Sequence, residues 1–176
     1  MSGGQMTKAD WAARRAAELE AHQQRWREVE EPKFRAKVRA VIERRGLASF
    51  MNDARWRALI AAVYADLPFP PAFQLQPVLG EREPLTDPEA LAGGWGGWSE
   101  LDDAAWAVEW LRVVPRYRKP RGRLVADEVI DCADAFRGLL ERLHIPYRTD
   151  AAGTFWIYGY ASADPATLTP PSETPT

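Results

Sequence analysis

The amino-acid sequence predicts an α+β protein, in which an antiparallel sheet of four to five strands is packed by helices and preceded by an N-terminal helical extension. Helical apolar periodicity fills the first third of the chain, and short strand-like segments joined by tight turns fill most of the rest. Such turns favour antiparallel pairing. We expect a basic helical extension at residues 1–48, one α+β domain at residues 49–160 and a disordered Pro/Thr-rich tail at residues 161–176.

Three helices are expected before residue 68. Residues 7–30 are rich in Ala, Arg, Glu and Gln, and Pro32 suits the first turn of a second helix that Gly46 would end. Asn52 or Asp53 would cap a third helix. Its apolar residues recur at steps of three and four: Trp56, Leu59, Ile60, Val63 and Tyr64.

Strands dominate the remainder. Residues 73–79 predict one strand, and residues 106–114 predict a central strand, since both of its faces are mostly apolar. The motif PRYRKPRGR at residues 115–123 predicts a basic, proline-bounded loop, and residues 126–143 predict a helix. Two final strands should flank a tight turn at residues 150–153.

Charge and cysteine content indicate the class of partner and the cellular compartment. The formal net charge is −2, but residues 1–48 carry 11 basic and 7 acidic side chains (+4), whereas the remainder carries 12 basic and 18 acidic ones (−6). An excess of +4 is too small to favour nucleic acid strongly. Cys132 is the only cysteine, which fits a reducing compartment. The first residues lack the apolar core of a signal peptide, so we expect a cytoplasmic protein without membrane contact.

Two segments carry side chains suited to binding. In residues 115–123, cationic side chains surround a tyrosine between prolines that restrict the backbone. Guanidinium groups bind phosphate or carboxylate, and aromatic rings stack on bases or partner side chains. The glycine-flanked tryptophans of residues 93–98 have few neighbours to cover them, so we expect them at the surface. The predicted partner-binding residues are Arg116, Tyr117, Arg118, Lys119, Arg121, Arg123, Trp95 and Trp98.

An equally favoured interpretation of the basic segment is structural. Its arginines would then pair with nearby acids of the same domain, such as Asp127 and Asp131. Strand alternation at Trp106 and Trp110 favours a place in the core for these two tryptophans.

No catalytic or metal-binding set is apparent in the sequence. Glu109 lies within a predicted strand, where an ion pair with an arginine is the favoured role. Neither His22 nor His144 has a second ligand at metal-binding spacing. Acids near Cys132 raise the pKa of its thiol, which makes it a poor nucleophile. We therefore expect no enzymatic activity, no bound metal and no cofactor.

Residues 52–160 resemble an uncharacterised family of small bacterial proteins that is defined as a domain of unknown function. The resemblance rests on NDARWRALIAAVYADLPFPPAFQLQPVL, WGGWSEL, VEWLRVVPRYRKPRGRLVADEVID, IPY and GTFWIYGY. It implies no particular mechanism. The size and architecture of the family also resemble those of bacterial immunity proteins, which bind and neutralise a toxin; this analogy is one of fold alone.

The sequence thus favours a bacterial, non-enzymatic protein-binding module, specifically an immunity-type protein that neutralises a toxin by direct binding. The expected partner is another protein. A nucleic-acid-binding module that uses residues 115–123 is the alternative. The least favoured hypothesis is an enzyme whose site assembles from Glu109, Arg116 and Arg123.

Overall fold

The computed structural model describes residues 7–163 and 168, and the chain divides into two compact units at residues 40 and 41. Helix α1 spans Lys8–Arg25, a π-helical segment spans Trp26–Glu30, and α2 spans Glu31–Arg45. No break separates these three elements, because Arg25 and Glu31, on either side of the π-helical segment, are themselves helical. The expectation that Pro32 opens a separate second helix was therefore wrong: it lies within a continuous helical run, directly after the π-helical segment. Gly46 follows α2 with φ of +61°, a conformation that suits glycine at a helix C-terminus.

The main sheet of the second unit contains four strands, all antiparallel to their neighbours, in the order β2-β3-β7-β6. Their bounds are Ala72–Pro77 for β2, Val108–Val114 for β3, Tyr147–Thr149 for β6 and Phe155–Tyr158 for β7. Every residue of β3 is buried, so the prediction of a central strand is confirmed. It begins two residues later than expected, because Ala105–Ala107 form a 3₁₀ turn.

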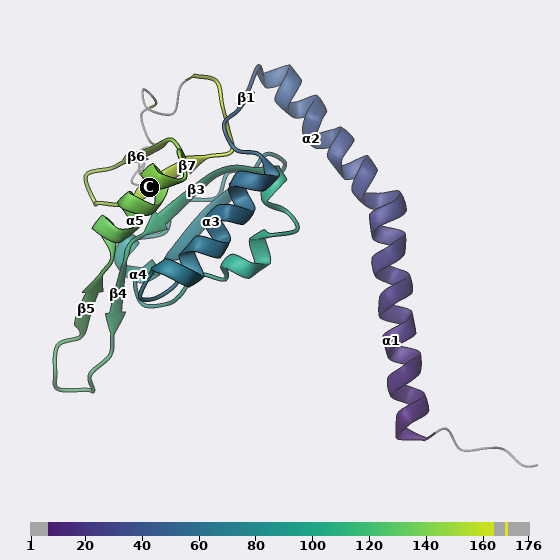
Figure 1. The fold of residues 1–176 in the computed structure, drawn as a ribbon, viewed down its shortest axis with the longest axis horizontal. Helices are drawn as coiled ribbons and strands as arrows, with labels where there is room; N and C mark the ends of the chain where they lie inside the picture. Colours follow the sequence, from purple (N-terminus) through teal and green to yellow (C-terminus); the bar gives the residue numbers. More distant parts are fainter. Residues whose placement is uncertain (1–6, 164–167, 169–176) are drawn as a thin grey trace, which may run out of the picture. The chain divides into compact units, whose positions relative to one another are not determined.

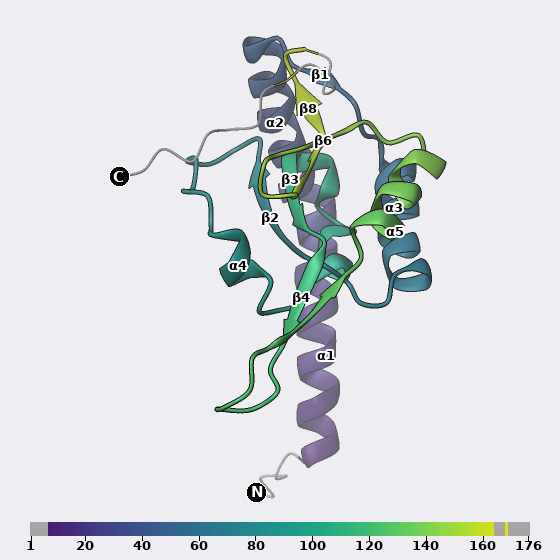
Figure 2. The same ribbon diagram turned by 90° about the vertical axis from the view of Figure 1, so that its left-hand side faces the viewer.

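Two short antiparallel ladders accompany this sheet. Strand β1 (Ala48–Ser49) pairs with β8 (Tyr160–Ala161), and β4 (Arg116–Lys119) pairs with β5 (Glu128–Asp131). The β4–β5 hairpin projects beyond the body of its unit in both views (Figures 1 and 2).

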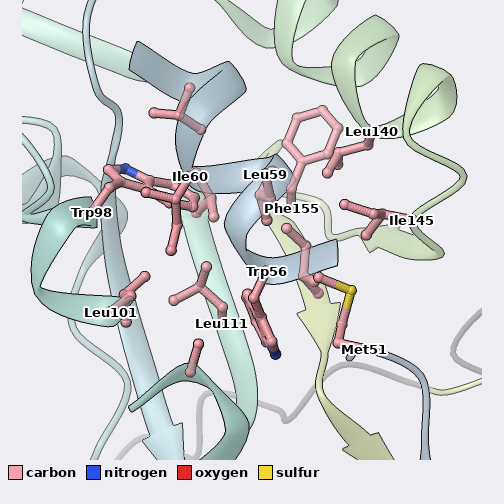
Figure 3. Close-up of a cluster of buried hydrophobic side chains, with 14 of the residues drawn as sticks. Met51, Trp56, Leu59, Ile60, Trp98, Leu101, Leu111, Leu140, Ile145 and Phe155 are labelled. Carbon is pink, nitrogen blue, oxygen red and sulfur yellow. The ribbon is translucent and has the colours of Figure 1, made fainter. Parts of the chain in front are cut away.

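Helices cover one face of the sheet. Helix α3 (Asp53–Asp66) and α5 (Ala133–Arg142) lie side by side over it, and a single turn, α4 (Pro88–Leu91), precedes the glycine-rich segment (Figure 1). The Asn52 side chain accepts a hydrogen bond from the Arg55 N–H at 2.8 Å, so the predicted cap of α3 is confirmed. The main core lies between these helices and the sheet (Figure 3) and includes Met51, Trp56, Leu59, Trp98, Leu111, Phe136, Leu140, Phe155 and Ile157.

The prediction of a helix from residue 126 was wrong in its first half. The β-branched Val129 and Ile130 suit an extended chain, and they lie opposite Arg118 and Tyr117 in the β4–β5 ladder. The Asp131 carboxylate accepts a hydrogen bond from the Ala133 N–H at 2.7 Å, and α5 begins there. The α+β class and the antiparallel sheet are confirmed.

Two further expectations concern the C-terminal tail and membrane contact. Most of the Pro/Thr-rich tail predicted at residues 161–176 lies outside the described residues. Over the part of the chain that the structure describes, none of the helices combines the length and the apolar character needed to cross a membrane.

Candidate functional site

The predicted basic loop is a β-hairpin. Arg116 lies opposite Asp131, and Lys119 lies opposite Glu128, so both ends of the ladder place unlike charges together. Residues 120–127 form the exposed tip. Leu124 at this tip is 99% exposed and Val125 53%. The expectation of a loop is therefore corrected to a two-stranded element whose basic tip also exposes Leu124 and Val125.

Trp95 is exposed, as predicted, and it packs against the base of the hairpin. Its ring meets the Tyr117 ring edge-on with centroids 5.8 Å apart, and the Phe69 ring also lies 5.8 Å from the Tyr117 ring. The Arg118 N–H donates to the Ala92 carbonyl at 2.7 Å, which ties β4 to the segment leading to Trp95. The glycine-rich segment and the hairpin therefore share one surface.

Trp98 is not on that surface. It was expected to be exposed, but its side chain is fully buried, and its indole N–H donates to the Pro71 carbonyl at 2.7 Å. In Figure 3 its ring points into the core toward Ile60. Gly96 makes this possible, because a Cβ there would lie 2.4 Å from the Pro71 oxygen. The glycine thus brings the chain against β2 and lets the indole enter the core.

The predicted cations separate into two groups. Arg116 donates to the Glu89 carboxylate at 2.7 Å and to the Ala152 carbonyl at 3.0 Å, and Arg118 lies 3.8 Å from Glu89 and 3.5 Å from Asp127. Both arginines thus pair inside the domain: Arg118 with Asp127, one of the acids that the structural interpretation named, and Arg116 with Glu89, which it did not name. The exposed group consists of Lys119, Arg121 and Arg123, for which no ion pair is found within the described residues.

A groove of about 710 Å³ opens beside Trp95. Its walls come from β2 and from the glycine-rich segment, and its one charged lining residue in the described part of the chain is Glu100. Sequence reasoning missed both this groove and the exposed Leu124. A leucine in a basic segment carries no signal of its exposure, and the groove forms from segments distant in sequence.

A model of a family described as "Family of unknown function (DUF6678)" matches residues 38–164 of the chain. The chain belongs to this family. The match begins within α2 and includes the whole hairpin, Trp95 and the groove, and it confirms and extends the resemblance seen over residues 52–160. Neither the curated proteins nor the solved structures include a match to this DUF6678 chain.

The buried carboxylate of this DUF6678 chain is an ion-pair partner. Glu109 is 7% exposed, and both of its oxygens accept from the Arg45 guanidinium, at 2.6 and 2.7 Å. Arg82 lies 3.8 Å away. Glu109 and Arg116 are seven residues apart, which corresponds to about 20 Å along an extended chain. They also bind different partners, Arg45 and Glu89. The structure therefore does not bring the three residues of the enzymatic hypothesis together around Glu109.

Cys132 is buried in the DUF6678 chain. Burial, and secondarily the charge of Asp131, raise the pKa of the Cys132 thiol to about 12. Among the described residues, no group of three or more His, Cys, Asp or Glu side chains is placed to hold a metal ion.

A buried polar network that sequence reasoning missed lies on the sheet. Arg112 is 1% exposed; it donates to the Thr154 hydroxyl at 3.3 Å and lies over the Trp156 ring. Asp150 accepts from the Trp156 indole N–H at 2.9 Å and from both the N–H and the hydroxyl of Thr154. Burial acts to raise the pKa of Asp150, but these hydrogen bonds and the charge of Arg112 outweigh it and lower the pKa.

Proposed function

We propose that the chain is a non-enzymatic protein-binding module whose contact region is the hairpin surface, defined as Trp95, Tyr117, Lys119, Arg121, Arg123, Leu124 and Val125. The observation that carries the proposal is the exposure of apolar side chains at the tip of a projecting hairpin. Isolated exposed leucines are common. Here Leu124 and Val125 are adjacent, and Val129 on β5 is also 59% exposed. Exposed apolar patches of this kind mark interaction sites.

The charges of the hairpin surface indicate the kind of partner. Arginine and aromatic residues are enriched at protein interfaces, and long-range attraction between unlike charges speeds association. Lys119, Arg121 and Arg123 place three cations on this surface, beside the exposed acids Asp127 and Glu128, on a domain whose remaining charge is negative. We infer that the partner presents an acidic surface around an apolar depression that receives Leu124.

The base of the hairpin is held in place before any partner binds. The Arg116–Glu89 pair fixes the start of β4, and Tyr117 packs against the rings of Phe69 and Trp95. Such contacts reduce the conformational entropy that binding would remove. The contacts therefore present the tip in a defined direction.

An immunity-type role is the specific form of this proposal. The partner would then be a toxin that this chain neutralises by direct binding, without chemistry of its own. An immunity-type role requires that the purified complex lack the activity of the free toxin. Substitutions in the hairpin surface should then restore the activity of the toxin.

Site-specific photo-cross-linking in the organism of origin tests the proposal. A photoreactive phenylalanine analogue is placed at Leu124 and, as a control, at Gly138, which is exposed on α5. We expect one protein to cross-link from position 124 only. The double charge reversal Arg121→Glu with Arg123→Glu should reduce the yield of this cross-link about tenfold, which corresponds to a loss of about 1.4 kcal/mol of binding free energy. Identical cross-links from both positions, insensitive to charge reversal, would contradict the proposal.

Nucleic acid is the alternative partner for the same cations. The feature that favours it is the clustering on one hairpin of three cations that form no ion pair with the residues the structure describes. It predicts that short RNA or DNA is retarded in a gel at low salt and that binding weakens steeply as salt rises. Unchanged mobility at low salt would eliminate this alternative and leave the protein-binding proposal standing.

A further inference from the structure

Strand β2 is an edge strand of the main sheet, and the direction of its backbone groups follows from its neighbours. The Glu109 carbonyl of β3 accepts from the Gly159 N–H at 2.9 Å, on the β7 side. Directions alternate along a strand, so Trp110, Arg112 and Val114 face β2. The register places these three opposite Gln76, Gln74 and Ala72.

The other residues of β2 therefore present their backbone outward. The N–H and C=O groups of Phe73 and Leu75 point away from β3, and within the described residues no other strand pairs with them. The same edge is closed one step earlier, where Pro71 forms a bridge with Trp95 and its carbonyl accepts from Trp98. The open part of the edge thus consists of two residues, with two donors and two acceptors.

This open edge lies in the groove beside Trp95. Ala72, Phe73 and Leu75 form one wall of the groove, and residues 90–91, 93–97 and 100–101 form the remainder. Gly97 leaves room for the Glu100 side chain, since a Cβ there would lie 3.1 Å from the Glu100 carboxyl carbon. An unpaired strand edge inside a groove is the arrangement by which sheets bind extended peptides as an added strand.

We propose that the groove binds an extended segment of the protein partner, which adds to the sheet along Phe73 and Leu75. The inference rests on the proposed function, because it names the second contact of the same partner. The partly exposed Leu91 and the exposed Trp95 favour apolar side chains in the segment. Glu100, the groove's charged residue, requires a lysine or arginine next to them, and the exposed Trp95 face can also pack on that cation.

Trp95 makes the two contacts continuous. One part of the residue lines the groove, and its ring meets Tyr117 at the base of the hairpin. A partner that places an acidic surface on the hairpin tip can therefore extend a strand into the groove without leaving the surface of this chain.

The test uses the full chain and a phage-displayed library of random dodecapeptides. In the free chain, hydrogen exchange measured by NMR should be faster at the Phe73 and Leu75 amides than at those of Gln74 and Gln76. Selected peptides should carry a lysine or arginine among apolar residues and should slow exchange at Phe73 and Leu75. Glu100→Gln should weaken a selected peptide about two- to fivefold, the range for an exposed ion pair.

A matched pair of glycine variants shows where the peptide sits. A Cβ at Gly94 or at Gly138 meets no atom within 4 Å, but only Gly94 lines the groove. Gly94→Leu should abolish peptide binding, and Gly138→Leu should preserve it. The inference is overturned if no peptide is selected, if bound peptides protect other amides, or if a second copy of the chain protects Phe73 and Leu75 without peptide.

The two proposals fail separately. If Gly94→Leu leaves the cross-link from Leu124 intact and no peptide binds the wild-type groove, the added strand is wrong while the hairpin proposal stands. If peptides bind and protect Phe73 and Leu75 but Leu124 captures no specific protein, the contact assigned to the hairpin surface is wrong.

Discussion

Trp95 and Tyr117 meet edge to face, with their ring centroids 5.8 Å apart, and so join the glycine-rich segment to the base of the β4–β5 hairpin. Trp95 remains 62% exposed in this contact. Three residues further along the chain, Trp98 is completely buried. Two tryptophans of one glycine-rich segment thus have separate roles, one at the surface and one in the core.

Alanine substitution should separate these roles. Trp95→Ala removes an exposed ring pair and should lower the free energy of unfolding by no more than about 1.5 kcal/mol. Trp98→Ala empties a core site and leaves the Pro71 carbonyl without its donor, which should cost about 3–5 kcal/mol. Urea unfolding followed by circular dichroism measures both. Equal losses would contradict the assignment of the two rings.

The pair of Glu109 and Arg45, in which the carboxylate is buried and the arginine is partly exposed, should behave as one unit. Replacing either residue alone, as Glu109→Met or Arg45→Met, leaves the other charge without its bidentate partner and should cost about 1–2 kcal/mol, because water reaches Arg45 and Arg82 lies near Glu109. The double variant should lose less than the sum of the single losses. A double-mutant cycle measured by urea unfolding gives the coupling, and strictly additive losses would contradict a direct pair.

The close approach at Gly96 predicts a second contrast. Gly96→Ala would place a Cβ 2.4 Å from the Pro71 oxygen and 2.8 Å from the Phe73 ring, and should cost about 1–3 kcal/mol. Gly94→Ala meets open space and should change the free energy of unfolding by less than about 0.5 kcal/mol. The midpoints of thermal unfolding of the two variants measure this difference. Equal midpoints would contradict the packing of this segment on β2.

Local signals in the sequence predicted the features that depend on neighbours along the chain. The Asn52 cap, the buried alternation of β3 and the turn before Gly153, whose φ is +73°, all follow from residue types within a few positions. Trp110 is buried, as its strand alternation predicted, whereas Trp106 lies just before β3 and is half-buried.

The features that sequence reasoning missed depend on distant segments. The exposure of a tryptophan that lies among glycines depends on which distant segment the glycines pack against. For Trp98 that segment lies directly before β2, where Gly96 approaches the Pro71 oxygen and the indole donates to the same oxygen. The helix predicted from residue 126 has apolar residues that fit helical spacing, and only pairing with β4 makes Val129 and Ile130 a strand. The partner of Arg116 is Glu89, which no local pattern indicates.

The thiol of Cys132 should be unreactive in the native protein. With its pKa raised to about 12, only about one thiol in ten thousand is ionised at pH 8, whereas an unfolded thiol with a pKa of about 8.5 is substantially ionised. An Ellman assay at pH 8 should show slow reaction in buffer and fast reaction in urea. Cys132 is the only cysteine, so the signal is unambiguous. Fast native reaction would contradict its burial.

Asp150 should make stability depend on pH. Its pKa is lowered in the folded state, so its contribution is fully present above the unfolded value of about 3.9 and is lost as pH falls through the folded value. Asp150→Asn removes charged acceptors for the Trp156 and Thr154 donors and should cost about 2 kcal/mol at pH 7. The gap between wild type and variant should stay constant down to about pH 5 and narrow below about pH 4.

Urea unfolding at pH 7, 5 and 3 measures that gap, and Asp102→Asn is its matched control. Asp102 is exposed, so its replacement removes the same formal charge without removing a hydrogen bond to the buried network. The control should unfold like the wild type at pH 7. A gap for Asp150→Asn that is as wide at pH 3 as at pH 7 would show that the carboxylate charge is not what stabilises the contacts to Arg112, Thr154 and Trp156, because a protonated Asp150 would then hold them equally well.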